Sequence, residues 1–384
     1  TLLDVPNRGH RVSPRMFNMA EATENDWDVL PGNGLLFRHG WSMAFCAWQW
    51  DVPRVGGRMG LAAPRVPAPD AGRMQLRYLA NEAGDDLALT DQHVGAVGNH
   101  LTIAPHPQLE AAAELLVRDA VYGPATVVPR AQWRFETATD GSHHVHLDGG
   151  FEPGRIYDVL FTPQDCPVVG AGMLAMRDFA AFLKTDAAPT PTKRVIGEGV
   201  SQCGRFLRTY LYNGLNLDES GTRAFDGLVI HVAGGRRGEF NHRYAQPSVQ
   251  PTPSFGHLFP FADDAQKGPN GEVDGLLERQ RALGGMPKIF YTDTSAEYWR
   301  GDAGLTHTKI ETDEDAEFPA ESRRYLFSST QHGAGALPLS RETQFGVAAN
   351  CFNIIDYRPL IRAALFNMEA WIKDDVEPPP SAYP

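Results

Sequence analysis

The sequence has few cysteines, no long apolar run and no recognisable sorting segment. Its four cysteines stand at unrelated spacings without a C-x-x-C pair, at Cys46, Cys166, Cys203 and Cys351. This spacing favours neither a zinc site nor a disulfide framework, so we expect no metal and four small buried side chains. No stretch approaches the roughly 18 apolar residues of a membrane span, and the first residues lack the basic and apolar regions of a signal peptide. These absences fit a cytoplasmic protein and equally an exported one whose signal peptide has been removed.

Acidic residues outnumber basic ones. Asp and Glu total 47 against 35 Lys and Arg, and the formal charge of −12 is spread along the chain. A nucleic-acid groove needs a basic face, so this balance argues against a polyanionic partner and leaves a small molecule as the expected one. Hydrophobic residues make up 42% of the 384, which is enough for a large buried core, and there is neither an internal repeat nor a low-complexity segment.

Apolar runs typical of buried strands alternate with segments of helical periodicity over most of the chain. We expect strands at 2–5, 41–48, 156–161, 194–199, 227–232, 288–292 and 324–328, and helices at 170–184, 202–213 and 359–373. Such alternation predicts an α/β fold with a mostly parallel central sheet and helices on both of its faces. Because the chain opens directly on a strand, we also expect the natural protein to extend before Thr1.

Two segments depart from this pattern. Between about 52 and 155, Gly and Pro are frequent, and short runs tend to alternate apolar with polar residues, at 74–79, 113–117, 131–135 and 143–147. This pattern is typical of antiparallel sheet, and we predict a β-rich subdomain inserted into the α/β domain. Between about 236 and 285, Pro, Gly, Phe and His occur without sustained periodicity, which favours an irregular cap over the site.

An apolar strand runs directly into a helix through a serine flanked by glycines, in the stretch Gly199-Val200-Ser201-Gln202-Cys203-Gly204. Small neighbours let strand and helix pass closely, so that Ser201 can be held in a strained turn with its hydroxyl exposed above the sheet. The usual pattern G-x-S-x-G would place glycine at 203, where this chain has Cys203, and the glycine follows at Gly204. The alternative is a plain β–α connection in which Ser201 only caps the helix.

A serine nucleophile needs a base, and the base needs an orienting carboxylate. After a turn of this kind the chain order is serine, acid and histidine, with the acid and the histidine on loops that follow later strands. The expected strand 288–292 is followed by Asp293 and Glu297, and the expected strand 324–328 is followed by His332. We therefore predict His332 as the base and Glu297 as the acid, with Asp293 as the alternative acid. The rival histidines do not follow the last strand, at His231, His257 and His307.

Two further groups of residues are expected at the same edge of the sheet. The backbone N–H of Gln202 stands at a helix N-terminus and can stabilise an oxyanion, and a second donor is expected in the loop after the first strand, at Arg8 or Gly9. Side chains near the ends of strands are candidates for the walls of a substrate pocket, at Trp48, Gln49, Trp50 and Trp299. The alternative for each aromatic side chain is a place in the core.

Several stretches resemble the bacterial α/β-hydrolase-domain proteins, a family of largely unassigned activity. They lie along nearly the whole chain, at 5–9, 150–157, 176–179, 199–205, 240–243, 297–299, 331–333 and 378–384. The resemblance implies the α/β-hydrolase fold in a single domain over residues 1–384. It also implies Ser201, His332 and Glu297 as the triad, because the Glu-Tyr-Trp stretch that begins at Glu297 recurs. The turn is also similar to that of glucuronoyl esterases, whose glycine likewise comes one position later, although those enzymes carry Arg where this chain has Gln202.

The residues and the resemblance together predict a serine hydrolase that cleaves a carboxylic ester through an acyl-enzyme on Ser201. Neither implies a cofactor or a metal. Other acyl-transfer, amide, lactone or carbon–carbon chemistry on the same residues is the first alternative, since a fold does not determine a reaction. A non-catalytic binding protein on the same scaffold is the second.

Overall fold

The structure, a computed structural model, describes residues 1–384 except 22–28, 68–71, 91–99, 250–257 and 344–345. Within the described residues the central sheet has six strands in the order β17-β16-β13-β12-β1-β2, and each neighbouring pair is parallel. The strands are β1 (Leu2–Asp4), β2 (Met43–Phe45), β12 (Ile196–Val200), β13 (Gly227–His231), β16 (Lys288–Thr294) and β17 (Ser322–Phe327). All carboxyl ends of these strands therefore lie at one edge, where the following loops can bring distant residues together.

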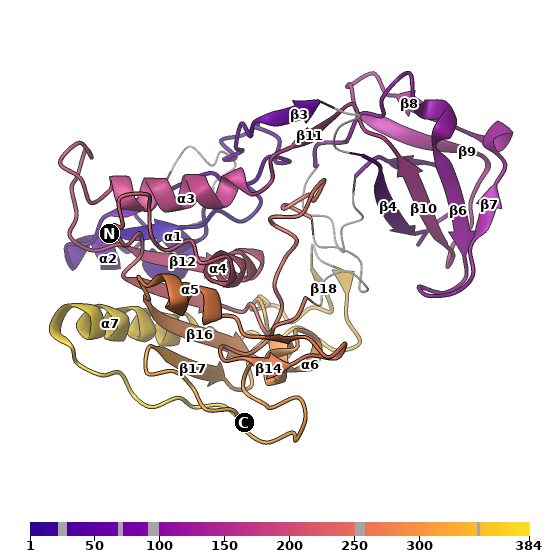
Figure 1. The fold of residues 1–384 in the computed structure, drawn as a ribbon. Helices are drawn as coiled ribbons and strands as arrows, with labels where there is room; N and C mark the ends of the chain where they lie inside the picture. The colour runs from indigo at the N-terminus through magenta and orange to yellow at the C-terminus, as the bar shows by residue number, and fades with distance from the viewer. Residues whose placement is uncertain (22–28, 68–71, 91–99, 250–257, 344–345) are drawn as a thin grey trace.

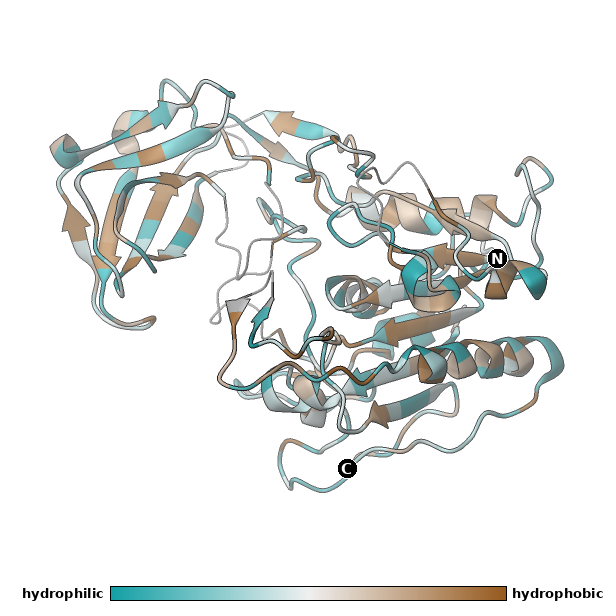
Figure 2. Ribbon diagram, turned by 180° about the vertical axis from the view of Figure 1, so that it is seen from behind, coloured by the Kyte–Doolittle hydropathy of each residue, from teal (hydrophilic) through white to brown (hydrophobic). Residues whose placement is uncertain are grey.

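Helices cover both faces of this sheet (Figure 1). On one face, α3 (Ala171–Phe182) and α4 (Gln202–Tyr212) share a core with Leu228 and Ile289. On the other face, Val229 and Phe290 share a core with α1 (Ser13–Asn18), α2 (Leu35–Arg38) and α7 (Arg358–Asp374). Since successive strand residues point to opposite faces, strands covered on both faces are apolar throughout, as the sequence pattern predicts. Figure 2 shows hydrophobic and hydrophilic residues mixed along α7, as expected for a helix with one buried side. We call the sheet and these helices the α/β core.

A β-rich region, residues 65–167, stands beside the α/β core (upper right in Figure 1). Its strands form the antiparallel sheets β4-β10-β6-β7 and β5-β9-β8 and the pair β11-β3. Buried residues of both larger sheets, among them Trp133 and Tyr157, give the region a hydrophobic core of its own. The elements are β3 (Arg65–Pro67), β4 (Met74–Leu79), β5 (Gly84–Ala88), a 3-10 helix (Glu110–Ala112), β6 (Glu114–Arg118), β7 (Thr126–Val128), a 3-10 helix (Arg130–Gln132), β8 (Trp133–Thr137), β9 (His143–Phe151), β10 (Ile156–Phe161) and β11 (Asp165–Pro167).

The expectation that 156–161 belongs to the parallel sheet is wrong. Strand β10 pairs antiparallel with β4 and β6, so the inserted region continues past 155 to β11. All but one residue of β10 are buried, and a strand covered on both faces carries the same continuous apolar pattern in either kind of sheet. Its buried charge, Asp158, is paired with Arg77 and Arg118 on the two neighbouring strands, at 2.6 and 2.7 Å.

The segment 236–285 is irregular in its described part. Its regular elements there are short, namely β14 (Gln266–Lys267), β15 (Val273–Asp274) and α5 (Glu278–Leu283). Phe240 and Leu276 join the core beside α4, whereas Tyr244 and Ala245 join the core of the β-rich region. The segment therefore connects the two hydrophobic cores. Part of the predicted cap, 250–257, lies outside the described residues.

The other predicted elements lie close to those of the structure. The strand expected at 41–48 is shorter, since β2 ends at Phe45 and Trp48 packs into the core beside α4. Helices α1 and α2 are too short to show a periodicity in the sequence and were not predicted. The remaining elements are α6 (Ser295–Arg300), a 3-10 helix (Ala303–Thr306), β18 (Glu342–Thr343) and β19 (Gly346–Val347). Among the described helices, none combines the length and the apolar character that crossing a membrane requires.

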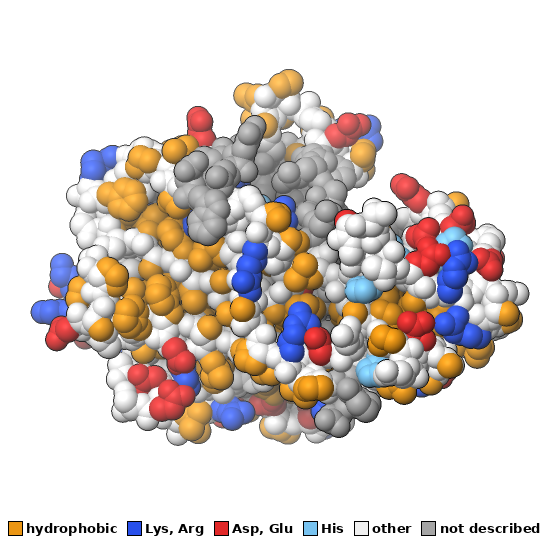
Figure 3. All heavy atoms as spheres, turned by 90° about the horizontal axis from the view of Figure 1, so that it is seen from above, with side chains coloured by type: hydrophobic (Ala, Val, Ile, Leu, Met, Phe, Trp, Pro, Cys, Tyr) orange, Lys and Arg blue, Asp and Glu red, His pale blue; other side chains and the backbone are white. Residues whose placement is uncertain are grey.

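The surface seen from above differs between the two parts (Figure 3). Hydrophobic side chains gather over the half that carries α3, where Leu174 and Phe182 are partly exposed. Acidic, basic and histidine side chains lie close together over the β-rich region. Charged residues of that region pair with one another, as Arg134 does with Glu136 and Asp148.

Candidate active site

Ser201 occupies the tight turn between β12 and α4. Its φ and ψ are 60° and −112°, a backbone conformation that residues other than glycine rarely adopt. Its N–H donates to the carbonyl oxygen of His231 on the neighbouring β13 at 2.8 Å, and its own carbonyl oxygen accepts from the N–H of Arg205 at 3.0 Å. The turn is thus held by hydrogen bonds on both sides, which is how a strained conformation persists.

The positions of the glycines follow from close contacts across this turn. A Cβ at Gly199 would lie 2.4 Å from the carbonyl oxygen of Cys203. A Cβ at Gly204 would lie 2.9 Å from the Cβ of Ala233 and 3.0 Å from the carbonyl oxygen of His231. The thiol of Cys203 has room, because it faces the carbonyl oxygen of Pro6 at 3.3 Å. Glycine is therefore needed at 204 rather than at 203, which explains the departure from the usual serine pattern.

Ser201, His332 and Glu297 form a continuous hydrogen-bonded chain. Oγ of Ser201 lies 2.9 Å from Nε2 of His332, and Nδ1 of His332 lies 2.6 Å from Oε1 of Glu297. The three residues follow three strands of the central sheet, β12, β17 and β16 respectively. The side chain of His332 is 35% exposed and that of Glu297 is 4% exposed. The structure thus brings together the three residues predicted from the sequence, in a geometry that allows the imidazole to take the hydroxyl proton.

A capping box at the start of α6 holds Glu297. Oε2 of Glu297 accepts hydrogen bonds from the N–H of Thr294, at 2.8 Å, and from the Thr294 hydroxyl. Burial acts to raise the pKa of Glu297, but the hydrogen bond and charge of His332 and the two hydrogen bonds from Thr294 outweigh it and hold that pKa below its ordinary value. Glu297 is therefore ionised at neutral pH, and it orients Nδ1 of His332 so that Nε2 faces the serine.

Asp293, the alternative acid, points elsewhere. Its Oδ1 accepts a hydrogen bond from the N–H of Gly234 at 3.0 Å, and within the described residues it makes no hydrogen bond to His332. Burial, and then the charge of Glu297, raise the pKa of Asp293 to about 6. The geometry therefore favours Glu297 as the partner of the imidazole.

The rival histidines have other surroundings. His231 is fully buried, and burial lowers the pKa of its imidazole to about 4. His307 has its Nε2 3.1 Å from the hydroxyl of Tyr298. His257 lies outside the described residues. Among the described histidines, only His332 hydrogen-bonds to the hydroxyl of Ser201.

The loop after β1 runs beside the residue that precedes Ser201. Asn7 and His10 exchange backbone hydrogen bonds of 2.8 and 2.9 Å, and Arg8 and Gly9 between them have φ values of 52° and 81°. The side-chain amide of Asn7 donates to the carbonyl oxygen of Val200 at 3.1 Å and so ties this loop to the serine turn. The N–H groups of Arg8 and Gly9 donate to no acceptor within the described part of the chain.

Gln202 brings its backbone, and not its side chain, to the space around Ser201. Its N–H is the first of α4 and so has no partner within the helix. Its buried side chain accepts from the amide of Gln49 at 2.8 Å and donates to the carbonyl oxygen of Val249 at 3.2 Å. Gln49, predicted for the pocket wall, is itself fully buried as the partner of Gln202.

Two of the three tryptophans predicted for the pocket are buried in hydrophobic cores. Trp48 is 2% exposed in the core beside α4 and donates from Nε1 to the carbonyl oxygen of Pro6. Trp50 is 5% exposed in the core of the β-rich region and donates to the carbonyl oxygen of Ala245. Trp299 is 88% exposed to solvent. The first two are core residues, because each finds apolar neighbours for its ring and a carbonyl acceptor for its N–H.

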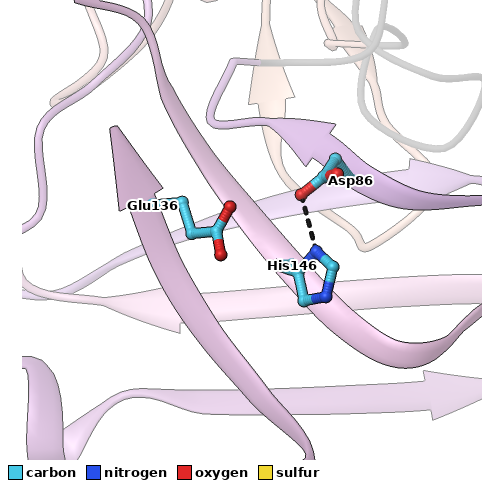
Figure 4. A group of neighbouring side chains, drawn as sticks. All are labelled: Asp86, Glu136 and His146. Carbon is cyan, nitrogen blue, oxygen red and sulfur yellow. Dashed lines mark hydrogen bonds and ion pairs between the residues drawn. The ribbon is translucent and has the colours of Figure 1, made fainter. Parts of the chain in front are cut away.

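A group of possible metal ligands lies in the β-rich region, apart from these residues. Asp86, Glu136 and His146 come from β5, β8 and β9, and their ligand atoms lie within 4.8 Å of one another (Figure 4). Nδ1 of His146 lies 2.9 Å from Oδ1 of Asp86, and Arg134 donates to Glu136 at 2.6 Å and to Asp148 at 3.0 Å. Each carboxylate of the group thus has a protein partner, and nothing in it requires a cation.

Three residues that support the hydrogen-bonded chain were not singled out from the sequence, namely Asn7, Thr294 and Tyr357. The hydroxyl of Tyr357 donates to the carbonyl oxygen of His332 at 2.9 Å. Thr294 has a local signal, since Thr-x-x-Glu before a helix is the pattern of a capping box. Asn7 and Tyr357 have none, because their partners are distant in the sequence.

Comparison with known proteins agrees with this architecture. Residues 133–384 match the family described as alpha/beta hydrolase domain. No curated protein and no solved structure matches the chain. The matched residues cover well over half of the chain and include the serine turn, α6 and the loop after β17. The chain therefore belongs to the alpha/beta hydrolase domain family.

Proposed function

We propose that this protein is a serine hydrolase that cleaves carboxylic esters, with Ser201 as nucleophile, His332 as base and Glu297 as orienting acid. One observation carries the proposal: the hydrogen bonds of 2.9 and 2.6 Å that join the serine hydroxyl, the imidazole and the carboxylate. A hydroxyl is a weak nucleophile at neutral pH, and an imidazole oriented by a carboxylate activates it.

In the proposed mechanism, Nε2 of His332 takes the proton of Ser201 while Oγ attacks the carbonyl carbon of the ester. Glu297 stabilises the imidazolium through Nδ1–H. The tetrahedral intermediate then collapses, the bond to the alcohol oxygen breaks, and His332 passes its proton to the departing alcohol. Water attacks the acyl-enzyme by the same route and releases the acid. Both steps use only these side chains and water.

The negative charge on the carbonyl oxygen needs donors, and backbone N–H groups supply them in this proposal. The first is the N–H of Gln202 at the N-terminus of α4, and the second is an N–H of the turn at Arg8 and Gly9. The hydrogen bond from Asn7 to Val200 supports this assignment, because it keeps the turn beside the serine. A donor of this kind is typically worth about 3–4 kcal/mol in the transition state.

Replacement of the nucleophile tests the proposal. Ser201→Ala should lower the turnover of p-nitrophenyl butyrate to background, a loss on the order of 10⁶-fold in kcat. The melting temperature should stay nearly unchanged, because only a hydroxyl is removed. The matched control is Ser220→Ala, a substitution at an exposed turn serine, which should keep wild-type turnover.

Covalent labelling gives a second readout. A fluorophosphonate probe should add once to the wild type and to the Ser220→Ala variant, as measured by intact mass, and not at all to Ser201→Ala. Turnover or labelling that survives in Ser201→Ala removes Ser201 from the mechanism. A panel of esters, amides and lactones then separates ester hydrolysis from other acyl-transfer chemistry, and esters should have the highest kcat/KM.

A further inference from the structure

Two buried arginines on α4 differ in their partners. Arg208 is fully buried and donates to carbonyl oxygens of the loops that pack on the helix, those of Gly235, Arg236 and Phe261. Arg205 is 6% exposed, yet its guanidinium makes no hydrogen bond or ion pair with the described residues. A guanidinium carries five N–H donors. Arg208 leaves only Nη1 without a partner, whereas no nitrogen of the Arg205 guanidinium has one among the described residues. The Arg205 nitrogens do not belong to the fully buried atoms without a partner, so a bound molecule can reach them. The comparison points to an acceptor for Arg205 that comes from a bound molecule.

Arg205 lies one helical turn after Ser201, on the same side of α4. Residues four apart share a face of a helix, and the N–H of Arg205 donates to the carbonyl oxygen of Ser201. Thr209 follows one turn later on this face of α4, and its hydroxyl accepts a hydrogen bond from the N–H of Gly238 at 3.2 Å. This face of α4 therefore packs against the loop after β13. Helical side chains lean toward the helix N-terminus, and the long side chain of Arg205 therefore extends toward the end that carries Ser201.

Further arginines surround this position. Burial, together with the charges of Arg8, Arg236 and Arg300, lowers the pKa of Arg205 to about 9. Arg236 is already paired with a carboxylate, that of Asp302 at 2.9 Å. These neighbours increase the positive potential at Arg205 and so favour an anion over a neutral acceptor.

Arg8, like Arg300, has no carboxylate partner among the described residues. Its side chain donates to the neutral side-chain oxygen of Asn7 at 3.0 Å. The nearby Asp51 accepts instead from the N–H and the hydroxyl of Ser248. The charge of Arg8 acts on Arg205 and contributes to the lowering of its pKa, so the two guanidinium groups lie in one electrostatic environment.

We propose that Arg205, with Arg8 beside it, binds a free carboxylate of the substrate, so that the ester cleaved at Ser201 is an anionic one. A guanidinium matches a carboxylate through two parallel N–H···O hydrogen bonds. One helical turn is about 5.4 Å, so the carboxylate stands a few bonds from the scissile carbonyl. This inference rests on the proposed function of Ser201 as a nucleophile.

Matched anionic and neutral esters test it. Monoethyl succinate, glutarate and adipate place the carboxylate in the acyl part, and acetyl esters of glycolate and 3-hydroxypropanoate place it in the alcohol part. Each is compared by pH-stat with the neutral ester in which a methyl group replaces the carboxylate. The wild type should show a higher kcat/KM for at least one anionic ester than for its neutral partner. Arg205→Gln should lower that ratio by roughly 10- to 100-fold, and Arg205→Lys by less.

The control is Arg208→Gln, which removes the partnered arginine of the same helix. It should lower the melting temperature because three carbonyl oxygens lose a donor, and it should leave the ratio of anionic to neutral kcat/KM within about twofold. A wild type that hydrolyses these esters but prefers no anionic one to its neutral partner overturns the inference. So does an Arg205→Gln variant that keeps the wild-type ratio.

Binding separates this inference from the proposal of esterase activity. The Ser201→Ala protein is titrated with the same anionic esters by calorimetry, and at least one should bind, with an affinity roughly 10- to 100-fold lower when Arg205→Gln is added. Failure of all of them to bind overturns the carboxylate site, whatever the turnover of the wild type. Binding that depends on Arg205, in a wild type that hydrolyses none of the esters, retains the site and removes the esterase proposal.

Discussion

The α/β core and the β-rich region differ in whether their charged residues are buried or exposed. In the α/β core, Glu297 and Arg205 are almost fully buried at the edge where the strands end. In the β-rich region, Arg134, Glu136 and Asp148 lie on an exposed face and pair with one another. Burying charge is unfavourable unless it is compensated, whereas exposed pairs contribute little to stability. The buried charges of the α/β core are therefore the better guide to chemistry.

The buried charge of the β-rich region sharpens this contrast. Asp158 is fully buried in β10, but Arg77 and Arg118 both pair with it from the neighbouring strands. A carboxylate compensated on two sides by its own sheet has no capacity left for a ligand. Burial alone therefore does not mark a site.

After the loss of the nucleophile itself, the largest expected effect distinguishes the two acids at the edge of the α/β core. Glu297→Gln should lower kcat for p-nitrophenyl butyrate by about 10³- to 10⁴-fold, because the amide cannot stabilise the imidazolium and can present an N–H to Nδ1 of His332. Asp293→Asn is the matched control. Its side-chain oxygen can still accept from Gly234, so kcat should stay within about tenfold of the wild type. The reverse order of effects would assign the acid to Asp293.

A smaller effect tests whether the core of the β-rich region contributes to the stability of the protein without taking part in the chemistry. Trp133 is 3% exposed in the core of the β-rich region, and Trp133→Ala should lower the free energy of unfolding by about 3–5 kcal/mol in a denaturant titration. Turnover per folded molecule should persist, because the hydrogen-bonded chain lies in the α/β core. Tyr122, 88% exposed in the same region, is the control, and Tyr122→Ala should change stability by less than about 0.5 kcal/mol. Loss of turnover in a stably folded Trp133→Ala variant would give the β-rich region a direct part in the chemistry.

The sequence predicts the central sheet and the hydrogen-bonded chain for the same physical reason. Parallel strands covered on both faces are continuous apolar runs, and the residues directly after each run lie at one edge of the sheet. Ser201, Glu297 and His332 each come after such a run, so their order and spacing suffice to place them together. The same reasoning misassigns β10, whose antiparallel partners leave no trace in its own residues.

Side-chain direction is what the sequence does not reveal. Trp48 and Gln49 are neighbours in the chain, and both are near the edge, yet one enters the core and the other bonds to Gln202. Arg205 and Arg208 likewise look alike in the sequence. The loops that pack on α4 come from distant parts of the chain, and their described residues provide acceptors for Arg208 and none for Arg205.

The smallest effect concerns two carboxyl groups beneath the serine turn. Asp4 on β1 and Glu198 on β12 lie opposite each other in the sheet, and both are buried. Asp4 accepts a hydrogen bond from the N–H of Ser13 at 3.2 Å, and Glu198 accepts one from the hydroxyl of Ser13 at 2.6 Å. One oxygen of each carboxyl group has no partner among the described residues. Burial raises the pKa of both groups, and the charge of Asp4 raises that of Glu198 further. The folded protein therefore keeps protons here that the unfolded chain releases near pH 4, a value typical of free carboxyl groups.

This difference in bound protons makes stability fall as pH rises. The contribution of the pair is fully present below about pH 4, where both states are protonated, and it is lost as pH rises through the raised pKa values of the folded state.

Glu198→Gln removes one titrating group, while its amide can donate to Asp4 and still accept from Ser13. Its melting temperature should exceed that of the wild type by a few degrees at pH 9, with a smaller difference at pH 5. Glu82→Gln, at an exposed carboxyl group of the β-rich region, should follow the wild type at both pH values. A gain for Glu198→Gln that is equal at pH 5 and pH 9 would show that the substitution acts through packing and not through the proton that Glu198 keeps in the folded protein.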